Sequence, residues 1–186
     1  MRHPPLYVRR AVPEDLETLR GWRSEAAEWL ARRHGSAQWA KPFRPRITLA
    51  LIKQGATLMA MLEPHGEPVA TCTLQPHGNP RLWTAEELAV PARYLRKVLV
   101  TRRQAGRGIG ASLQHWVRAR AAADGARLVR AGAWSDNAGL HAYYHSQGWH
   151  HVRTVPGVPA GALFETSAVA LPDLPVYEVG ETGFPA

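Results

Sequence analysis

The chain has 186 residues and is 45% hydrophobic, and its 23 Lys and Arg against 15 Asp and Glu give a formal net charge of +8. This length permits one domain with its own core, and no apolar run reaches the roughly 18 residues that a membrane-spanning helix needs. The N-terminus, MRHPPLYVRR, has no apolar secretory segment, and a lone cysteine excludes a disulfide framework. We therefore expect a cytoplasmic protein without a membrane partner.

The charge is unevenly distributed along the chain. All Lys and Arg lie at or before Arg153, together with 11 acidic residues, and the four charged residues after it are acidic. The first 153 residues therefore carry +12 and the remainder −4. A basic body suits nucleic acid or a polyanionic small ligand, but no block of about five or six like charges marks a nucleic-acid arm. A nucleic-acid binder is thus the third hypothesis, behind the two developed below.

Hydrophobic periodicity in the first half predicts a strand, two helices and a β-hairpin. The first helix is the clearest of these, because Pro13 suits its first turn, apolar residues recur at helical spacing, and Gly35 can end it. The hairpin turn contains Pro64 and Gly66. The expected elements cover residues 7–10, 12–35, 45–54, 57–62 and 69–74.

The second half predicts strands that alternate with helices. A polar loop leads to the strand RYLRKVLV, and the glycine-rich stretch RQAGRGIGASL opens a helix that Gly125 can end. Three further strands are expected in ARLVRAGAW, WHHVRTV and ALFETSAVA, with a helix in NAGLHAYYHSQGW. We expect one domain over residues 1–170 and a Pro- and Gly-containing acidic tail over residues 171–186.

The glycine-rich stretch predicts a phosphate site. Backbone N–H groups at a helix entrance can hold a phosphate, and a Cβ there would keep it away. Gly106, Gly108 and Ala111 fit a dinucleotide-binding fingerprint loosely, but that fingerprint usually follows the first strand and needs an acidic residue at the end of the next. A P-loop is excluded because no Gly-Lys-Ser/Thr follows. Because the glycine-rich stretch follows a late strand, we favour a different kind of pyrophosphate site. The alternative is a glycine turn that only reverses the chain.

At this point the sequence resembles the GCN5-related N-acetyltransferase superfamily. That family's signature, R/Q-x-x-G-x-G/A, follows its fourth strand and binds the pyrophosphate of acetyl-CoA. Gly108 and Gly110 take the two small positions, whereas Ala105 stands where the family usually has Arg or Gln. Downstream, Asn137 and Tyr144 precede Gly-Trp at the spacing at which the family shows Asn, Tyr and Gly-Phe.

The resemblance implies the fold and the chemistry. We expect an α/β (α+β) fold, with a central mixed, mostly antiparallel sheet of six or seven strands flanked by about four helices. We expect acetyl-CoA as co-substrate without a metal, direct attack by a small-molecule primary amine, and no nucleic acid; a homodimer is allowed. The implied cofactor-binding residues are Val98, Leu99, Val100, Ala105, Gly106, Arg107, Gly108, Ile109, Gly110, Ala111 and Asn137.

The resemblance also suggests catalytic and acceptor residues. It implies Tyr144 as the general acid near the sulfur, although a buried aromatic that closes the helix onto the sheet is the alternative. Glu86 and Glu87 are candidate bases, or solvated loop residues. The family's acceptor site lies between the first two helices and the later strands, and the aromatic residues offered for it are Trp39, Phe43 and Trp83.

Two departures keep a second hypothesis open. Ala105 removes a usual phosphate ligand, and Gly132 stands where many relatives carry an acidic residue that can anchor the amine. Both mildly favour a non-catalytic acyl-CoA-binding or sensing module on the same fold. A zinc site is not expected, because His141 and His145 share a helix face without a Cys or carboxylate partner. Cys72 lies in an apolar strand and reads as a core residue.

Overall fold

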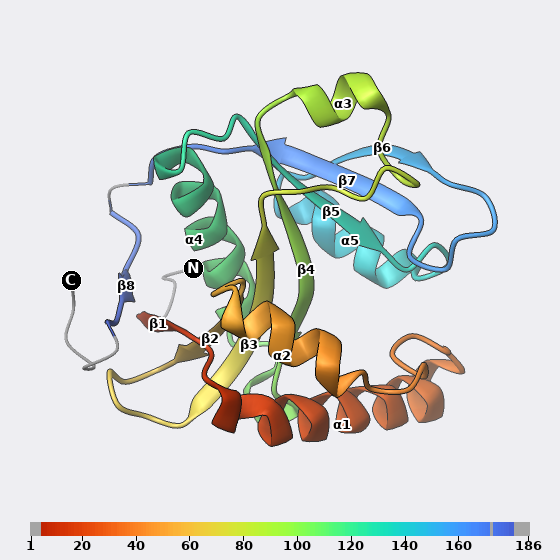
Figure 1. Cartoon of the computed structure of the whole chain (residues 1–186). Coiled ribbons are helices and arrows are strands. Elements are labelled where there is room, and N and C mark those ends of the chain that lie inside the picture. Colours follow the sequence, from red (N-terminus) through yellow and green to blue (C-terminus); the bar gives the residue numbers. More distant parts are fainter. Residues whose placement is uncertain (1–4, 172, 181–186) are drawn as a thin grey trace. The chain divides into compact units, whose positions relative to one another are not determined.

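The computed structural model of the chain describes residues 5–171 and 173–180 (Figure 1). These residues form two compact units, each made of separate stretches of chain. The first unit is Met1–Thr73 with Lys97–Gly110 and Pro175–Ala186, and the second is Leu74–Arg96 with Ala111–Leu174. No helix among the described residues is long and apolar enough to cross a membrane.

The first unit contains the strand series β3-β2-β1-β8, from β1 (Leu6–Arg10), β2 (Thr57–Met61), β3 (Pro68–Gln75) and β8 (Val176–Glu178). The predicted hairpin forms, with β2 antiparallel to β1 and to β3. Strand β8 runs parallel to β1, the ring of Tyr177 stacks on Tyr7 with centroids 5.2 Å apart, and Val179 is buried. A strand therefore covers the outer edge of β1.

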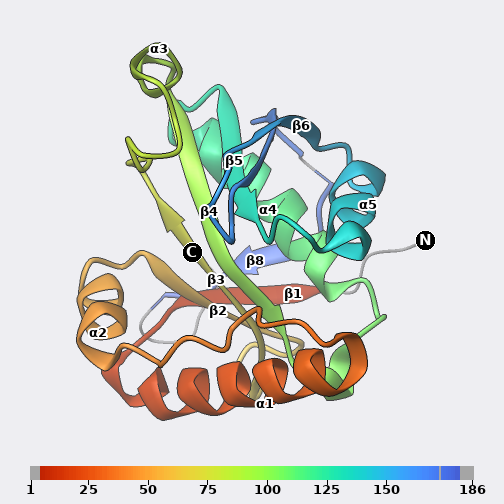
Figure 2. The ribbon, with the colours of Figure 1, turned by 90° about the vertical axis from the view of Figure 1, so that its right-hand side faces the viewer.

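Two helices complete the first unit, α1 (Leu16–His34) and α2 (Pro45–Lys53). The 3-10 turn η1 (Pro13–Asp15) leads into α1, and the Asp15 carboxylate accepts hydrogen bonds from both terminal nitrogens of Arg9 at 2.7 and 2.9 Å. Helix α1 ends at Gly35, whose φ of 60° is the left-handed cap that glycine provides. Helices α1 and α2 pack on each other, and α2 packs on β2 (Figure 2).

The second unit contains the strand series β6-β7-β5-β4, from β4 (Ala92–Val100), β5 (Leu128–Ala133), β6 (His150–Thr154) and β7 (Ala162–Ser167). Strand β5 is parallel to β4 and antiparallel to β7. Helix α5 (Ala138–Ser146), cyan in Figure 1, packs on β6. Helix α4 (Ile109–Ala123) is followed by Gly125, which adopts a φ of 77°, and the remaining short helix is α3 (Ala85–Ala89).

The fold class agrees with the expectation, and two elements exceed it. Eight strands are described, against six or seven expected, and the additional strand is β8 within the expected tail. Of that tail, residues 172 and 181–186 lie outside the described residues. The short helix α3 was not expected. It begins at Thr84, whose hydroxyl accepts from the Glu87 amide while the Glu87 carboxylate accepts from the Thr84 amide.

Candidate active site

The glycine-rich loop connects the end of β4 to α4. The Thr101 amide donates to the Val69 carbonyl at 2.9 Å, which ties the start of the loop to β3. A 3-10 turn, η2 (Arg102–Gln104), follows, and Gly106 and Gly108 then adopt φ values of 80° and 79°. Both glycines are exposed. Because the first amides of a helix have no acceptor within it, the N–H groups at the start of α4 can bind an anion.

Some side chains of this loop make contacts with each other or with α1. Gln104 accepts a hydrogen bond from Arg107 at 2.6 Å, and the guanidinium of Arg102 lies 3.8 Å from the ring centroid of Trp29 on α1. The second contact is a cation–π interaction that helps to fix η2 on the end of α1. Ala105 is exposed and offers no polar side chain. The loop thus keeps Arg107, itself exposed, as a cation next to the two left-handed glycines.

The last residues of β4 leave regular strand geometry. The parallel ladder with β5 pairs Ala92–Leu95 with Leu128–Ala131, and β4 continues beyond the end of this ladder to Val100. Lys97 has a φ of 54°, which is uncommon outside glycine and stores on the order of 1 kcal/mol of backbone strain. The segment Val98–Val100, expected to bind the pantetheine arm through its backbone, directly follows this irregularity.

A pocket of about 290 Å³ lies in the first unit, lined from α1, α2, the segment between them, and strands β2, β3 and β4. Two of the three aromatic residues expected in the acceptor site, Trp39 and Phe43, line it, and so does Leu99. The full lining is Leu19, Trp22, Arg23, Trp39, Lys41, Pro42, Phe43, Arg44, Ile47, Thr48, Thr57, Thr71, Thr73, Lys97 and Leu99.

Three threonines on the strands contribute to this lining. Thr57 on β2 lies opposite Thr73 on β3, and Thr71 follows on the same face of β3. The Thr71 hydroxyl donates to the Leu58 carbonyl at 2.8 Å, whereas the buried hydroxyl of Thr57 has no protein partner. An unpaired buried hydroxyl costs about 1–3 kcal/mol, which a polar ligand group could recover.

The two adjacent tyrosines of α5 have different surroundings. The ring of Tyr144 stacks on Phe164 with centroids 4.9 Å apart and meets Trp149 edge-on at 5.1 Å, and only 7% of the residue is exposed. This burial, with a smaller contribution from Tyr143, raises the pKa of Tyr144 well above that of a tyrosine in water. The Tyr143 hydroxyl accepts instead from Gln114 of α4 at 3.4 Å.

Asn137 begins α5 as its N-cap. Its side-chain oxygen accepts a hydrogen bond from the Leu140 amide at 2.9 Å, so it satisfies one of the free amides of the first turn. The residue expected among the cofactor ligands therefore also serves as the cap of this helix.

With this geometry described, comparison with known proteins decides the family. The model of the acetyltransferase (GNAT) family matches residues 17–149, which is more than half of the chain. The chain belongs to this acetyltransferase family. The matched residues include the glycine-rich loop and Tyr144 on α5.

Relatives and solved structures agree with membership of the acetyltransferase family. The uncharacterized N-acetyltransferase YesJ of Bacillus subtilis (strain 168) is 27% identical over 147 residues, which are 77% of this chain and 81% of YesJ. A GNAT-family acetyltransferase from Listeria monocytogenes 4b F2365 has a TM-score of 0.73 and 19% identity, over 87% of this chain and 94% of that chain. The PaiA N-acetyltransferase from Thermoplasma acidophilum, solved with coenzyme A, has a TM-score of 0.66 and 15% identity, over 87% and 98%.

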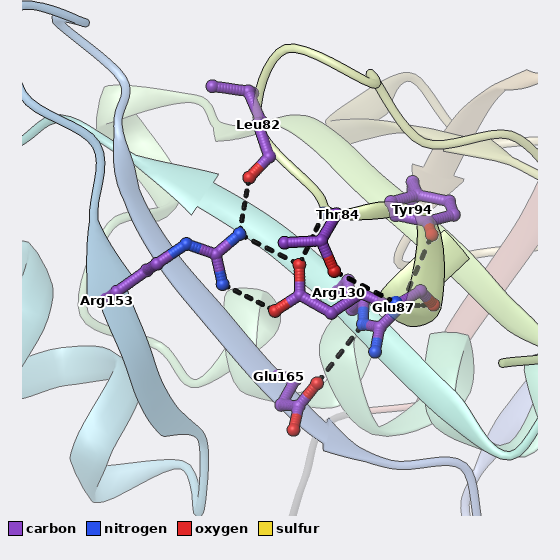
Figure 3. A network of polar contacts seen from close by, with 7 residues as sticks. All are labelled: Leu82, Thr84, Glu87, Tyr94, Arg130, Arg153 and Glu165. Carbon is purple, nitrogen blue, oxygen red and sulfur yellow. Dashed lines mark hydrogen bonds and ion pairs between the residues drawn. The ribbon is translucent and has the colours of Figure 1, made fainter. Parts of the chain in front are cut away.

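One of the two candidate bases in this GNAT chain is held in an ion pair. Figure 3 shows the Glu87 carboxylate facing the guanidinium of Arg153, with nitrogen–oxygen distances of 2.5 and 2.8 Å. The hydrogen bonds from Arg153 are the largest cause that lowers the pKa of Glu87 to about 2. A carboxylate with so low a pKa is a weak base, so we assign Glu87 a structural role. Glu86, the other candidate, is exposed at the start of α3.

Trp83, the third aromatic residue proposed for the acceptor site, lies next to the Glu87–Arg153 ion pair and does not line the pocket. It is 4% exposed in the second unit, and its ring meets Tyr94 edge-on at 6.0 Å. Arg130 lies 4.8 Å and Arg153 5.9 Å from the Trp83 ring centroid. Arg130 also donates to Glu165 (Figure 3). A tryptophan that contacts two arginines and is buried in a hydrophobic cluster is a packing residue here.

Gly132 stands at a position where the backbone leaves no room for a side chain. A Cβ on Gly132 would lie 2.9 Å from the carbonyl oxygen of Ala160, so a side chain there requires the backbone to move. Two of the histidines of α5 and β6, His141 and His151, pack against the ring of Phe164. Cys72 is fully buried, and burial raises the pKa of its thiol to about 12.

Proposed function

We propose that the protein is an acetyl-CoA-dependent N-acetyltransferase that modifies a primary amine of a small molecule in the pocket of the first unit. The proposal rests on the end of β4, which belongs both to the pocket lining and to the segment that leads into the glycine-rich loop. Lys97 and Leu99 line the pocket, and the same strand passes into the glycine-rich loop after Val100. An amine in the pocket would therefore lie beside the segment that we expect to hold the thioester.

The donor site is proposed to be the loop and the strand before it. The amides of Gly106 to Gly110 would bind the pyrophosphate, with Arg107 adding a positive charge. The backbone of Val98–Val100 would pair with the pantetheine arm. The similar fold of the PaiA N-acetyltransferase, solved with coenzyme A, supports coenzyme A as the carrier.

The reaction is proposed to be direct attack. The ammonium first loses a proton, the amine nitrogen forms a bond to the acetyl carbonyl carbon, and the carbon–sulfur bond breaks. The electron pair leaves with the sulfur, and a proton from Tyr144 would convert the thiolate to the thiol. Tyr144 is protonated at neutral pH, as a proton donor must be, and its raised pKa means that it would give up the proton only once negative charge develops on the sulfur. The proton from the amine leaves through water, since Glu87 is held by Arg153.

The experiment has two steps. Acetyl-CoA should raise the melting temperature of the chain, and no shift at millimolar acetyl-CoA would contradict both the transferase and the acyl-CoA-binding module. Thiol release over a panel of amines then separates the two, because a non-catalytic binding or sensing module shows the shift without turnover. Cys72 should not disturb a thiol assay on the folded protein, since it is buried and its pKa is raised to about 12.

A further inference from the structure

The pocket of the first unit has an unusual charge for a site that receives a protonated amine. Four cations line it, Arg23, Lys41, Arg44 and Lys97, and among the described lining residues there is no carboxylate. Of the acids in η1 and α1, Asp15 and Glu17 pair with Arg9 and Arg20, whereas Glu14, Glu25 and Glu28 are not among the residues that line the pocket. Four like charges around one cavity repel a cationic ligand and attract an anionic one.

The geometry around Arg23 shows how this charge is held. Its guanidinium lies 5.2 Å from the ring centroid of Trp39 and donates a hydrogen bond to the Lys41 carbonyl. Burial, and then the neighbouring charge of Arg44, lower the pKa of Arg23. Both effects act against the charged form of Arg23, so an anion bound between Arg23 and Arg44 would favour that form and offset them.

Apart from the four cations and four threonines, the lining is apolar and fits a bulky hydrocarbon group. The rings of Trp22, Trp39 and Phe43 contribute to it, and Ile47 leaves 48% of its surface exposed beside them. At about 290 Å³ the pocket is at the small end of ligand sites, which begin at about 300 Å³ for drug-sized molecules. A single amino-acid-sized molecule suits this volume better than a polyamine or a sugar of several rings.

We propose that the acceptor is an amine that also carries a carboxylate and a bulky apolar group, as in a free α-amino acid with an aromatic or branched side chain. This inference rests on the proposed function and names its substrate class. The carboxylate would lie between Arg23 and Arg44, the side chain against the rings, and the buried Thr57 hydroxyl would be available to a polar group of the ligand.

The same charges explain how the reaction proceeds without a carboxylate base. An ammonium among four cations has a lower pKa than in water, because neighbouring positive charge favours the neutral amine. The substrate carboxylate offsets the repulsion on binding, while the amine releases its proton to water. The balance is one ammonium and one acetyl thioester giving one amide, one free thiol and one proton.

A matched substrate pair tests the proposal. L-Phenylalanine and L-phenylalaninamide share the amine and the ring and differ in the carboxylate; Trp, Leu and Met provide three further such pairs, and spermidine serves as the polycation. For at least one pair, thiol release should give a kcat/KM at least about tenfold higher for the acid than for its amide. Spermidine should give none.

A matched pair of variants tests the residues. Arg44→Gln should raise KM for the preferred acid and reduce the acid-to-amide ratio, without changing the melting-temperature shift given by acetyl-CoA. Arg46→Gln removes an exposed cation from the first turn of α2, two residues after Arg44 and outside the pocket lining, and should leave both quantities unchanged. Equal use of acids and amides, turnover of spermidine, or an unchanged ratio in Arg44→Gln would each overturn the inference.

These failures can be told apart from failure of the proposed function. If amides or spermidine are acetylated instead, thiol release still supports an acetyltransferase and only the acceptor class is wrong. If acetyl-CoA binds but no carboxylated amine reacts, the acceptor class is overturned and the binding module is favoured. If acetyl-CoA neither shifts the melting temperature nor is consumed, the proposed function fails with it.

Discussion

A tyrosine enclosed by aromatic rings is suited to keep a proton until a charge develops next to it. Tyr144 has this environment through Phe164 and Trp149, whereas the hydroxyl of Tyr143 is bonded to Gln114. The two hydroxyls are adjacent in sequence, so they form a natural pair for assigning the general acid.

We expect Tyr144→Phe to lower kcat by about 10²-fold or more, the lower end of what general acid catalysis contributes. KM for acetyl-CoA should change little, because the ring remains in its aromatic cluster. Steady-state kinetics on both substrates would measure this. Tyr143→Phe is the control and should retain most of kcat; a larger loss in Tyr143→Phe would transfer the role to that residue.

Glu87 and Arg153 illustrate a carboxylate whose charge stabilises the fold. Its pKa is lowered from 4.5 to about 2, so its stabilising contribution is complete above pH 4.5 and is lost as the pH falls toward 2. Glu87→Gln should lower the free energy of unfolding by about 1 kcal/mol at pH 7, since the pair is partly exposed to solvent and screened by it.

Urea unfolding of the wild type and Glu87→Gln at a series of pH values would measure the difference. The two curves should converge between pH 4.5 and 2. Activity at pH 7 provides the second readout, because kcat should be nearly unchanged in Glu87→Gln. A loss of several orders of magnitude would instead restore Glu87 as the catalytic base.

At the scale of the element, the glycine-rich loop allows backbone strain to be separated from ligand binding. Gly106 and Gly157 both have positive φ, 80° and 72°, and a Cβ on either would meet no atom within 4 Å. Alanine at each position should therefore cost a similar amount of stability, about 1–2 kcal/mol.

Only Gly106→Ala should lower the affinity for acetyl-CoA, by at least about tenfold, because its methyl group would lie where the phosphate approaches the amides. Calorimetric titration of acetyl-CoA into both variants would measure this, with their melting temperatures as the control for folding. Equal affinities in the two variants would contradict the phosphate role of the loop.

The sequence predicted elements well where local signals agree. Helix α4 begins within the glycine-rich stretch and ends before Gly125, as expected, because glycines precede it and Gly125 follows it. Helix α3 was not expected, although Thr84 and Glu87 have the sequence spacing of a capping box, which is typical of a helix start. Strand β8 could not be predicted from its composition, because its pairing with β1 depends on residues at the opposite end of the chain.

The candidate site also has parts that local sequence predicts and parts that depend on the fold. The loop and Tyr144 are recognisable because their residues lie close together in a local motif. The cationic pocket is not, because Arg23, Lys41, Arg44 and Lys97 come from four separate positions that only the folded first unit brings together. Trp83 was proposed for the pocket from residue type alone, and its packing in the second unit could not be predicted without tertiary contacts.

For the whole molecule, the net charge of +8 predicts a dependence on salt. Acetyl-CoA carries several phosphate charges, so a cationic protein should capture it faster at low ionic strength. We expect kcat/KM for acetyl-CoA to fall several-fold when NaCl rises from about 20 to 300 mM, as the Debye length shortens. The melting temperature over the same range is the control, and kcat/KM that is independent of salt would contradict the prediction.

The pairing of β8 with β1 has a consequence for folding during synthesis on the ribosome. Strand β1 leaves the ribosome early and β8 late, with the residues of the second unit between them. Until β8 emerges, the outer backbone groups of β1 are free to pair with strands of other chains. A nascent chain stalled before Val176 should therefore aggregate more readily than the released one, and need a chaperone most just before synthesis of this strand.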